Sequence, residues 1–167
     1  MLTYNDIYEI LRKEKYSEPL QPLPKSFISE FSQYINENSV DYTKTEILEM
    51  LKLKDRLVKG VLNNVQGSKL NGSRKQEEQL PNIANFSFLG VEGESLVISL
   101  DQEGIAVSTG SACTSTSTEP SHVLKALGLP ESLAKGNIRI TLGRQTNKKD
   151  IDYVLKILPG IVTKLRR

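Results

Sequence analysis

Apolar side chains recur every three or four residues in five parts of the chain, and this spacing predicts five amphipathic helices. Each part begins at a residue that can cap a helix or, in one case, at a proline suited to the first turn. The predicted helices cover residues 3–16, 24–35, 43–62, 121–129 and 147–165. In the last of them, Asn147 and Asp150 match a capping box, and Pro159 is expected to kink the helix.

The first two helices are expected to form a hairpin. Three prolines in "SEPLQPLP" (17–24) end the first helix, because a proline ring disfavours helical backbone at and before its own position. The polar stretch "NENSVDY" (36–42) follows the second helix and is the best candidate for a linker. Residues 1–42 are therefore interpreted as a helical extension, a hairpin that docks on the rest of the chain or on a partner.

Two later stretches alternate apolar and polar residues with the two-residue period of a β-strand. They are "NIANFSF" (82–88) and "NIRITLG" (137–143). The tripeptide "IAV" (105–107) is interpreted as a further brief strand, whereas the apolar run at 92–100 fits a helix or a strand equally well. The polar stretch 67–79 is expected to be a loop.

Strands and helices alternate on a short period from residue 43 onward. This order predicts an α/β (α+β) fold class, in which helices cover a small mixed sheet. A chain of 167 residues has room for one ordinary domain and a short extension. The expected organisation is therefore the helical extension over 1–42 and one domain over 43–167.

Composition limits the classes of partner. Lys and Arg number 22 against 20 Asp and Glu, a formal net charge of +2 that gives the whole chain no drive towards nucleic acid. No stretch approaches the roughly 18 apolar residues of a membrane span, and the N-terminus lacks the apolar run of a secretory signal. One cysteine cannot form an internal disulfide, so a reducing, cytoplasmic setting is expected. One histidine, His122, excludes a multi-histidine metal site, and no metal site is predicted.

The single cysteine, Cys113, lies in "STGSACTSTST" (108–118), a stretch without aromatic, charged or large apolar side chains. A lone cysteine is most often a small buried hydrophobic residue. This segment, however, has little apolar surface with which to bury a thiol, and its glycine, serine and threonine residues are typical of a mobile surface loop. An accessible thiol in such a loop is a candidate nucleophile, whose reactivity depends on how much thiolate its surroundings allow.

Three sequence blocks carry a resemblance to a known family. They are "GSACTS" around Cys113, "EPSHVL" (119–124) and "IRITLGR" (138–144). In this order and spacing they resemble the C-terminal part of the NifS/IscS-type cysteine desulfurases, which are pyridoxal-phosphate (PLP) enzymes of the class V aminotransferase group. The resemblance runs from about residue 53 to residue 167. It implies the small C-terminal domain of a fold-type I PLP enzyme.

The resemblance also implies roles for individual residues. In the family a loop thiolate attacks the sulfur of the substrate, L-cysteine, and leaves alanine and an enzyme persulfide; Cys113 matches this catalytic position. The sulfur then passes to acceptor or scaffold proteins, for iron–sulfur cluster assembly or tRNA thiolation. Arg139 matches the arginine that binds the substrate α-carboxylate, a task suited to a guanidinium group; from the strand pattern alone, the alternative is an arginine that faces solvent. His122 is interpreted as structural, and Arg144 as a structural ion-pair residue.

The family's cofactor-binding block is missing. A desulfurase forms a Schiff base between PLP and a lysine in a serine–histidine–lysine block, whereas the only histidine of this chain is followed by Val123. Without that lysine and an electron sink, the family reaction has no route. The chain alone is therefore expected neither to bind PLP nor to act as a desulfurase, and no cofactor-binding residue is assigned. Activity would require a complementary chain that supplies the PLP domain.

Residues 4–35 carry a second, shorter resemblance, to the N-terminal helices of archaeal GINS replication proteins. It rests on a leucine–proline turn before an aromatic-bearing helix. Two alternative functions stay open beside the desulfurase fragment. In one, the chain is a protein-interaction module or a GINS-like replication component fused to an inert desulfurase fragment. In the other, it is a sulfur-relay protein that accepts persulfide sulfur on Cys113 without cofactor chemistry.

Overall fold

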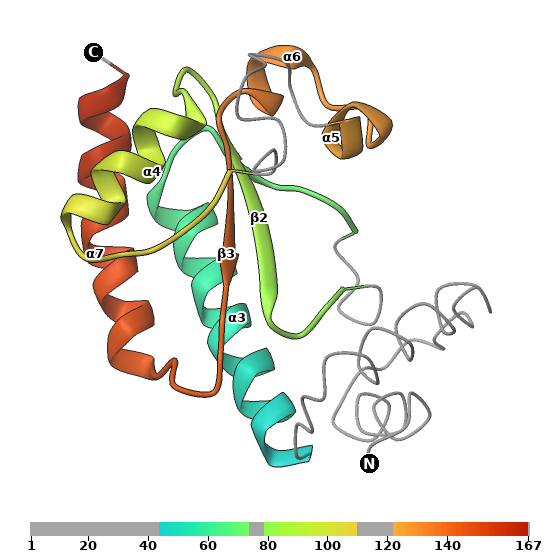
Figure 1. The fold of residues 1–167 in the computed structure, drawn as a ribbon, viewed down its shortest axis with the longest axis vertical. Coiled ribbons are helices and arrows are strands. Elements are labelled where there is room, and N and C mark those ends of the chain that lie inside the picture. Colours follow the sequence, from blue (N-terminus) through green and yellow to red (C-terminus); the bar gives the residue numbers. More distant parts are fainter. Residues whose placement is uncertain (1–43, 74–78, 110–121, 167) are drawn as a thin grey trace.

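The computed structural model describes residues 44–73, 79–109 and 122–166 (Figure 1). In the labels of Figure 1, its elements are α3 (Lys44–Asn64), β1 (Ser68–Leu70), β2 (Ile83–Phe88), α4 (Gly93–Gln102), α5 (His122–Ala126), α6 (Glu131–Ala134), β3 (Asn137–Thr141) and α7 (Lys148–Leu165). The predicted hairpin over 1–42 and the segment 110–121, which includes Cys113, lie outside the described ranges.

The three described strands form one antiparallel sheet in the order β1-β2-β3. Leu70 of β1 pairs with Phe86 of β2, and Phe86 pairs in turn with Ile138 of β3, so the register is continuous across the sheet. The predicted fold class, with helices covering a small sheet, is confirmed. The expectation that the sheet would be mixed is corrected, because both strand pairings are antiparallel.

The brief strand predicted at 105–107 is also corrected. The Ile105 N–H donates back to the Leu100 carbonyl oxygen (2.9 Å) and closes the end of α4, so this apolar tripeptide does not join the sheet as a strand. Only the next residue, Ser108, reaches β3, through an isolated antiparallel bridge to Arg139. Apolar character at 105–107 thus marks packing against the core, and not a strand of its own.

Helices α3, α4 and α7 cover one face of the sheet, as Figure 1 shows. Because side chains alternate between the two faces of a strand, every second residue of β2 and β3 packs against these helices. The buried core is aliphatic apart from two phenylalanines, and its members are Leu57, Val61, Val65, Ala84, Phe86, Phe88, Val91, Leu96, Leu100, Ile105, Ile138, Ile140, Leu142, Ile151, Val154, Leu158 and Val162.

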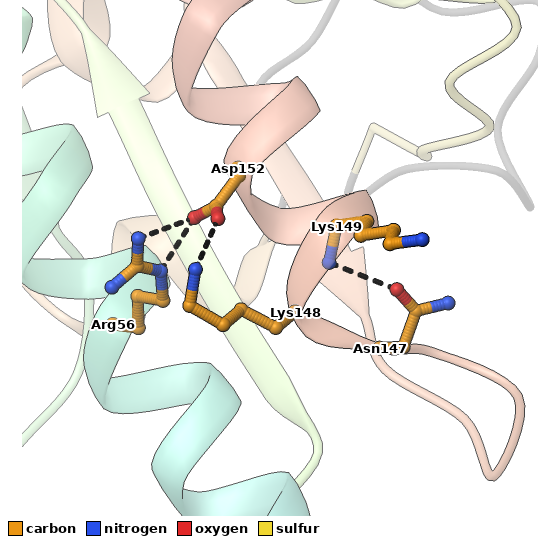
Figure 2. A network of polar contacts seen from close by, with 5 residues as sticks. All are labelled: Arg56, Asn147, Lys148, Lys149 and Asp152. Carbon is orange, nitrogen blue, oxygen red and sulfur yellow. Dashed lines mark hydrogen bonds and ion pairs between the residues drawn. The ribbon is translucent and has the colours of Figure 1, made fainter.

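α3 and α7 pack against each other and approach closely where Gly60 faces Leu155. A Cβ atom at Gly60 would lie 2.5 Å from both terminal methyl carbons of Leu155, so glycine allows this approach without a shift of that side chain. A polar network joins the same two helices (Figure 2). In it, the Asp152 carboxylate accepts hydrogen bonds from Arg56 Nε of α3 (2.6 Å) and from Lys148 Nζ (2.6 Å).

The capping box predicted for the last helix is confirmed. The Lys149 N–H donates to Asn147 Oδ1 (2.9 Å), and the Asn147 N–H donates to Asp150 Oδ2 (2.9 Å). Figure 2 includes the first of these bonds. α7 continues through Pro159 to Leu165, and the kink expected there stays a prediction.

Other elements clarify what the sequence left open. The apolar run at 92–100 forms the helix α4, which buries Gly93, Leu96 and Leu100 at helical spacing. The stretch 67–79, expected to be a loop, contains the short strand β1, and the single turn of α6 was not predicted. None of the helices in the described ranges combines the length and apolar character that crossing a bilayer requires.

Candidate functional site

The second face of the sheet, opposite α3, α4 and α7, is lined by polar side chains. Each strand residue next to a core residue belongs to this face, because successive side chains point to opposite sides. We call it the polar face; its members are Lys69, Asn71, Asn85, Ser87, Asn137, Arg139 and Thr141, together with Ile83.

One end of the polar face lies against α6. Ser87 is 0% exposed and Asn137 is 5% exposed, and Asn137 Nδ2 donates to the Ala134 carbonyl oxygen of α6 (2.7 Å). Asn85 is half-buried, whereas Arg139 is exposed. The polar face is therefore open at the end that carries Arg139.

Four residues lie side by side in one row across the sheet: Asn71, Asn85, Arg139 and Ser108. The Asn71 N–H donates to the Asn85 carbonyl oxygen (2.8 Å), and Asn85 stands directly opposite Arg139. The Arg139 N–H donates to the Ser108 carbonyl oxygen (2.6 Å), and the Ser108 N–H donates to that of Arg139 (3.1 Å). We call these residues the cross-strand row. Since Ser108 begins the predicted cysteine loop, the row connects Arg139 to the base of that loop.

The exposed side chain of Arg139 makes no hydrogen bond or ion pair with another residue in the described ranges. A guanidinium group in this position can bind a carboxylate through two parallel hydrogen bonds. The structure thus brings Arg139 to an open polar surface, where a small ligand can reach it. Its role in binding the substrate stays a prediction.

A network of amide and hydroxyl groups lies beside Arg139. Asn71 Nδ2 donates both to Asn85 Oδ1 (2.6 Å) and to Ser87 Oγ (2.8 Å). The Asn71 Oδ1 atom is buried and has no hydrogen-bond partner among the described residues. Leaving this buried acceptor unpaired costs free energy. The two hydrogen bonds that Asn71 Nδ2 donates offset this cost and hold the amide in its orientation.

The remaining residues singled out in the sequence have different outcomes. The candidate nucleophile Cys113 lies outside the described residues, and so does the side chain of His122, the first residue of α5; both roles stay predictions. Arg144 forms the expected structural ion pair, from its Nε to Glu46 Oε1 of α3 (2.8 Å).

The polar face does not fit a PLP cofactor. A PLP site needs a lysine for the Schiff base and a carboxylate beside the pyridinium nitrogen. The part of this face that the structure describes carries neither Asp nor Glu, and its lysine, Lys69, is exposed on the edge strand β1 opposite Ser87. No cofactor-binding residue is therefore assigned here.

An open groove of about 570 Å³ shares no lining residue with the polar face; it is lined by Leu89, Gly90, Val91, Glu92, Ser95, Ser132, Lys135 and Leu165. Lys135 is paired with Glu131 (2.9 Å), and a hydrogen bond and the charge of Glu131 raise the pKa of Lys135. Across the described ranges, no three His, Cys, Asp or Glu residues group as metal ligands would. The groove thus brings together no set of groups suited to catalysis.

Lys54 of α3 is a buried titratable residue outside the polar face. It is 3% exposed, and its Nζ donates to the Leu80 carbonyl oxygen (2.6 Å). Burial lowers the pKa of Lys54 from 10.5 to about 8. Its position on the core side of the fold indicates a role in stability.

Asn71 and Asn85 are not identified as site residues by the sequence alone. The polar positions of the strand 83–88 were visible in its alternation, but their partners depend on cross-strand register. Asn71 lay in a stretch expected to be a loop, so the strand β1 that brings it beside Asn85 was not foreseen. The sequence feature that could have identified Asn85 is the polar residue at every second position of the predicted strand.

Comparison with known proteins identifies the relatives of this fold. The model of the family described as "Aminotransferase class-V" matches residues 32–154. The chain is 50% identical over 121 residues to the cysteine desulfurase IscS of Dictyoglomus turgidum, covering 72% of this chain and 30% of that protein. It is 47% identical over 118 residues to the IscS of Clostridium botulinum, covering 71% of this chain and 30% of the relative.

A solved structure of a NifS-like protein has the same arrangement. It superposes with a TM-score of 0.58 at 33% identity, over 71% of this chain and 28% of that chain. The chain thus spans about 30% of the length of the curated relatives that it matches. The resemblance of residues 4–35 to GINS proteins finds no support, and the family match begins at residue 32. That motif is a leucine–proline turn before an aromatic-bearing helix, a pattern that many helical hairpins share.

Proposed function

Because this chain belongs to the aminotransferase class-V family, and its curated relatives are cysteine desulfurases, we propose that it takes part in sulfur transfer from L-cysteine. Cys113 receives the substrate sulfur as a persulfide, and Arg139 binds the α-carboxylate of the substrate. The persulfide sulfur then passes to an acceptor or scaffold protein, as in iron–sulfur cluster assembly or tRNA thiolation.

One observation supports these two roles most directly. Arg139 presents an exposed guanidinium on the polar face, while its backbone forms two hydrogen bonds with Ser108, five residues before Cys113. A chain spans at most about 3.5 Å per residue, so the Cα atoms of Ser108 and Cys113 are no more than about 17 Å apart. A substrate held by Arg139 would therefore be within reach of a thiol tethered at this point.

The net reaction balances without an external oxidant. The Cys113 thiolate attacks the sulfur of L-cysteine, an S–S bond forms and the carbon–sulfur bond breaks. The electron pair of the broken bond stays with the β-carbon, which takes a proton and leaves as alanine. The products are alanine and the Cys113 persulfide.

The chain is proposed to need a second polypeptide for this reaction. Its residues match about 30% of the length of the relatives and their polar face does not fit PLP, so the reaction requires the part of the family that they do not cover, which we propose a complementary PLP-domain chain supplies. The partners are therefore L-cysteine, a PLP-domain chain and a sulfur acceptor.

The test combines the purified chain with a polypeptide that comprises the part of an IscS relative that this chain does not cover. With PLP and L-cysteine, the mixture is expected to form alanine and to add one sulfur atom to Cys113, as measured by mass spectrometry of its peptide. Cys113→Ser is expected to abolish both the added sulfur and alanine formation. Arg139→Ala is expected to raise the KM for L-cysteine. Arg139→Lys is the control, because lysine keeps the positive charge but cannot form the two parallel hydrogen bonds.

Two results would contradict the proposal. Alanine formation by the chain alone with PLP would remove the need for a second polypeptide. Undiminished turnover by the Cys113→Ser variant in the mixture would exclude Cys113 as the sulfur acceptor.

A further inference from the structure

Asn85 and Arg139 stand opposite each other on neighbouring strands, and their side chains lie on the same face of the sheet. Arg139 directs its backbone N–H and C=O to Ser108, and Asn85 directs its carbonyl oxygen to Asn71, so neither bonds to the other. They therefore form a non-hydrogen-bonded pair, in which the Cα atoms lie about 4.5 Å apart and the side chains approach more closely than in a hydrogen-bonded pair.

Asn71 sets the orientation of the Asn85 amide. The bond from Asn71 Nδ2 to Asn85 Oδ1 (2.6 Å) engages the amide oxygen on the side of β1. Asn85 stands directly opposite Arg139 of β3, and the bond accepted by Asn85 Oδ1 leaves the Asn85 Nδ2 group available as a donor. This Nδ2 group makes no hydrogen bond to another described residue, and it is not among the buried atoms without a partner, so solvent reaches it.

The two neighbouring groups are both donors. A guanidinium group has no acceptor atom, and the NH₂ group of the Asn85 amide is likewise only a donor. They cannot bond to each other, and the described polar face offers no carboxylate to either. A ligand with two acceptor oxygens on one carbon, a carboxylate, satisfies both groups at once.

We propose that Asn85 is a second substrate-carboxylate donor beside Arg139, and that Asn71 is a positioning residue that orients it. This inference rests on the proposed function, in which Arg139 binds the α-carboxylate of an amino acid. Asn85 adds specificity to that site, because a carboxamide or an ester in place of the carboxylate offers fewer acceptor positions to the same pair of donors.

The inference is tested by two-dimensional ¹H–¹⁵N NMR of the labelled full chain titrated with L-alanine, an unreactive amino acid with the same α-carboxylate. L-alaninamide, which lacks the carboxylate, is the control ligand. L-alanine is expected to shift the Arg139 Nε–H and the Asn85 side-chain NH₂ resonances with one common dissociation constant. L-alaninamide is expected to shift neither.

Three variants separate the roles. Asn85→Ala is expected to weaken L-alanine binding about tenfold, the loss typical of one hydrogen bond to a charged group. Asn85→Asp keeps the shape but places a carboxylate against Arg139, so no L-alanine binding is expected. Asn71→Ala is expected to weaken binding less than Asn85→Ala does, while Asn64→Ala, at an exposed amide that ends α3, leaves the affinity unchanged. The dispersion of each spectrum reports whether the variant folds.

The outcomes distinguish this inference from the proposed function. If Arg139→Ala abolishes binding while Asn85→Ala and Asn85→Asp bind like the wild type, the role of Asn85 is excluded and the proposed role of Arg139 stands. If L-alanine shifts neither side chain of the wild-type chain at any concentration, the carboxylate site itself is excluded, and the inference fails with it.

Discussion

Replacement of the buried Lys54 by methionine is expected to change how the free energy of unfolding depends on pH. Burial lowers the pKa of Lys54 from 10.5 to about 8. A lysine whose pKa is lower in the folded chain than in the unfolded chain is protonated less when folded. Between about pH 8 and pH 10.5 the unfolded state therefore binds more protons, so the stability of the wild-type chain rises with pH over this interval.

The size of the effect follows from the two pKa values. Each pH unit between them is worth about 1.4 kcal/mol, which gives roughly 3 kcal/mol in total. Below pH 8 this amount is the cost of a buried ammonium group, and methionine removes that cost because it is uncharged. Methionine also loses the hydrogen bond from Nζ to the Leu80 carbonyl oxygen (2.6 Å), which contributes about 1–2 kcal/mol. The variant is therefore expected to be more stable than the wild type by about 1–2 kcal/mol at pH 7, and less stable by a similar amount at pH 10.5.

The measurement is urea denaturation followed by circular dichroism, at constant ionic strength and at several pH values between 7 and 10.5. The quantity of interest is the difference in unfolding free energy between Lys54→Met and wild type, since tyrosines and other lysines titrate in both proteins and cancel. Lys52→Met makes the same substitution at an exposed position of the same helix, where a surface change is expected to stay within about 0.5 kcal/mol. A Lys54→Met difference that stays constant across this pH range would refute the reasoning, because it would mean that Lys54 binds its proton equally in both states.

Three further predictions concern the frame of the fold. Hydrogen bonds and charge from Lys148 and Arg56 lower the pKa of Asp152, so its contribution to stability is present above 3.8 and is lost as the pH falls through the folded-state pKa. Asp152→Asn should therefore lower the urea midpoint more at pH 7 than at pH 2, and equal effects at both pH values would contradict this. Gly93→Ala would place a Cβ atom 2.5 Å from a backbone carbonyl oxygen of β3, and a loss of about 2–4 kcal/mol in chemical denaturation is expected; an unchanged midpoint would show that the backbone yields freely. Asn147→Ala removes a capping-box side chain, and a loss of about 1 kcal/mol is expected, with Asn147→Asp restoring most of it.

The long helices of this fold could be predicted because many residues contribute to each apolar stripe. α3 and α7 follow the expected spacing, and the capping box at Asn147 marked the start of α7. The short elements could not be predicted from the sequence. β1 has three residues with one apolar member, Leu70, which is too few to show a period, and it forms because Leu70 pairs with Phe86. The run at 105–107 is apolar but is not a strand, because Ile105 packs in the core and Val107 against it, while the Ile105 N–H closes the end of α4.

The candidate site was predictable in part for a related reason. Alternation in "NIRITLG" correctly puts Arg139 on the face opposite its apolar neighbours, because the two-residue period of a strand is a local property. Which residues stand beside Arg139 is a matter of register between strands, and register depends on contacts between segments about fifty residues apart in the sequence. Asn85 and Ser108 become neighbours of Arg139 only through that register.

The same alternation separates stability from binding along each strand. In β3, Ile138 and Ile140 are buried against the helices, while Arg139 between them is exposed on the polar face. Substitution of Arg139 should therefore change ligand binding with little effect on the free energy of unfolding, because no described residue depends on its side chain. Asn85 differs, since its amide oxygen accepts the bond from Asn71, and Asn85→Ala should cost about 1 kcal/mol of stability as well as affinity. Asn85→Asp retains an acceptor for Asn71 and should therefore stay folded. Loss of L-alanine binding by this variant would then result from the changed charge on the polar face and not from unfolding.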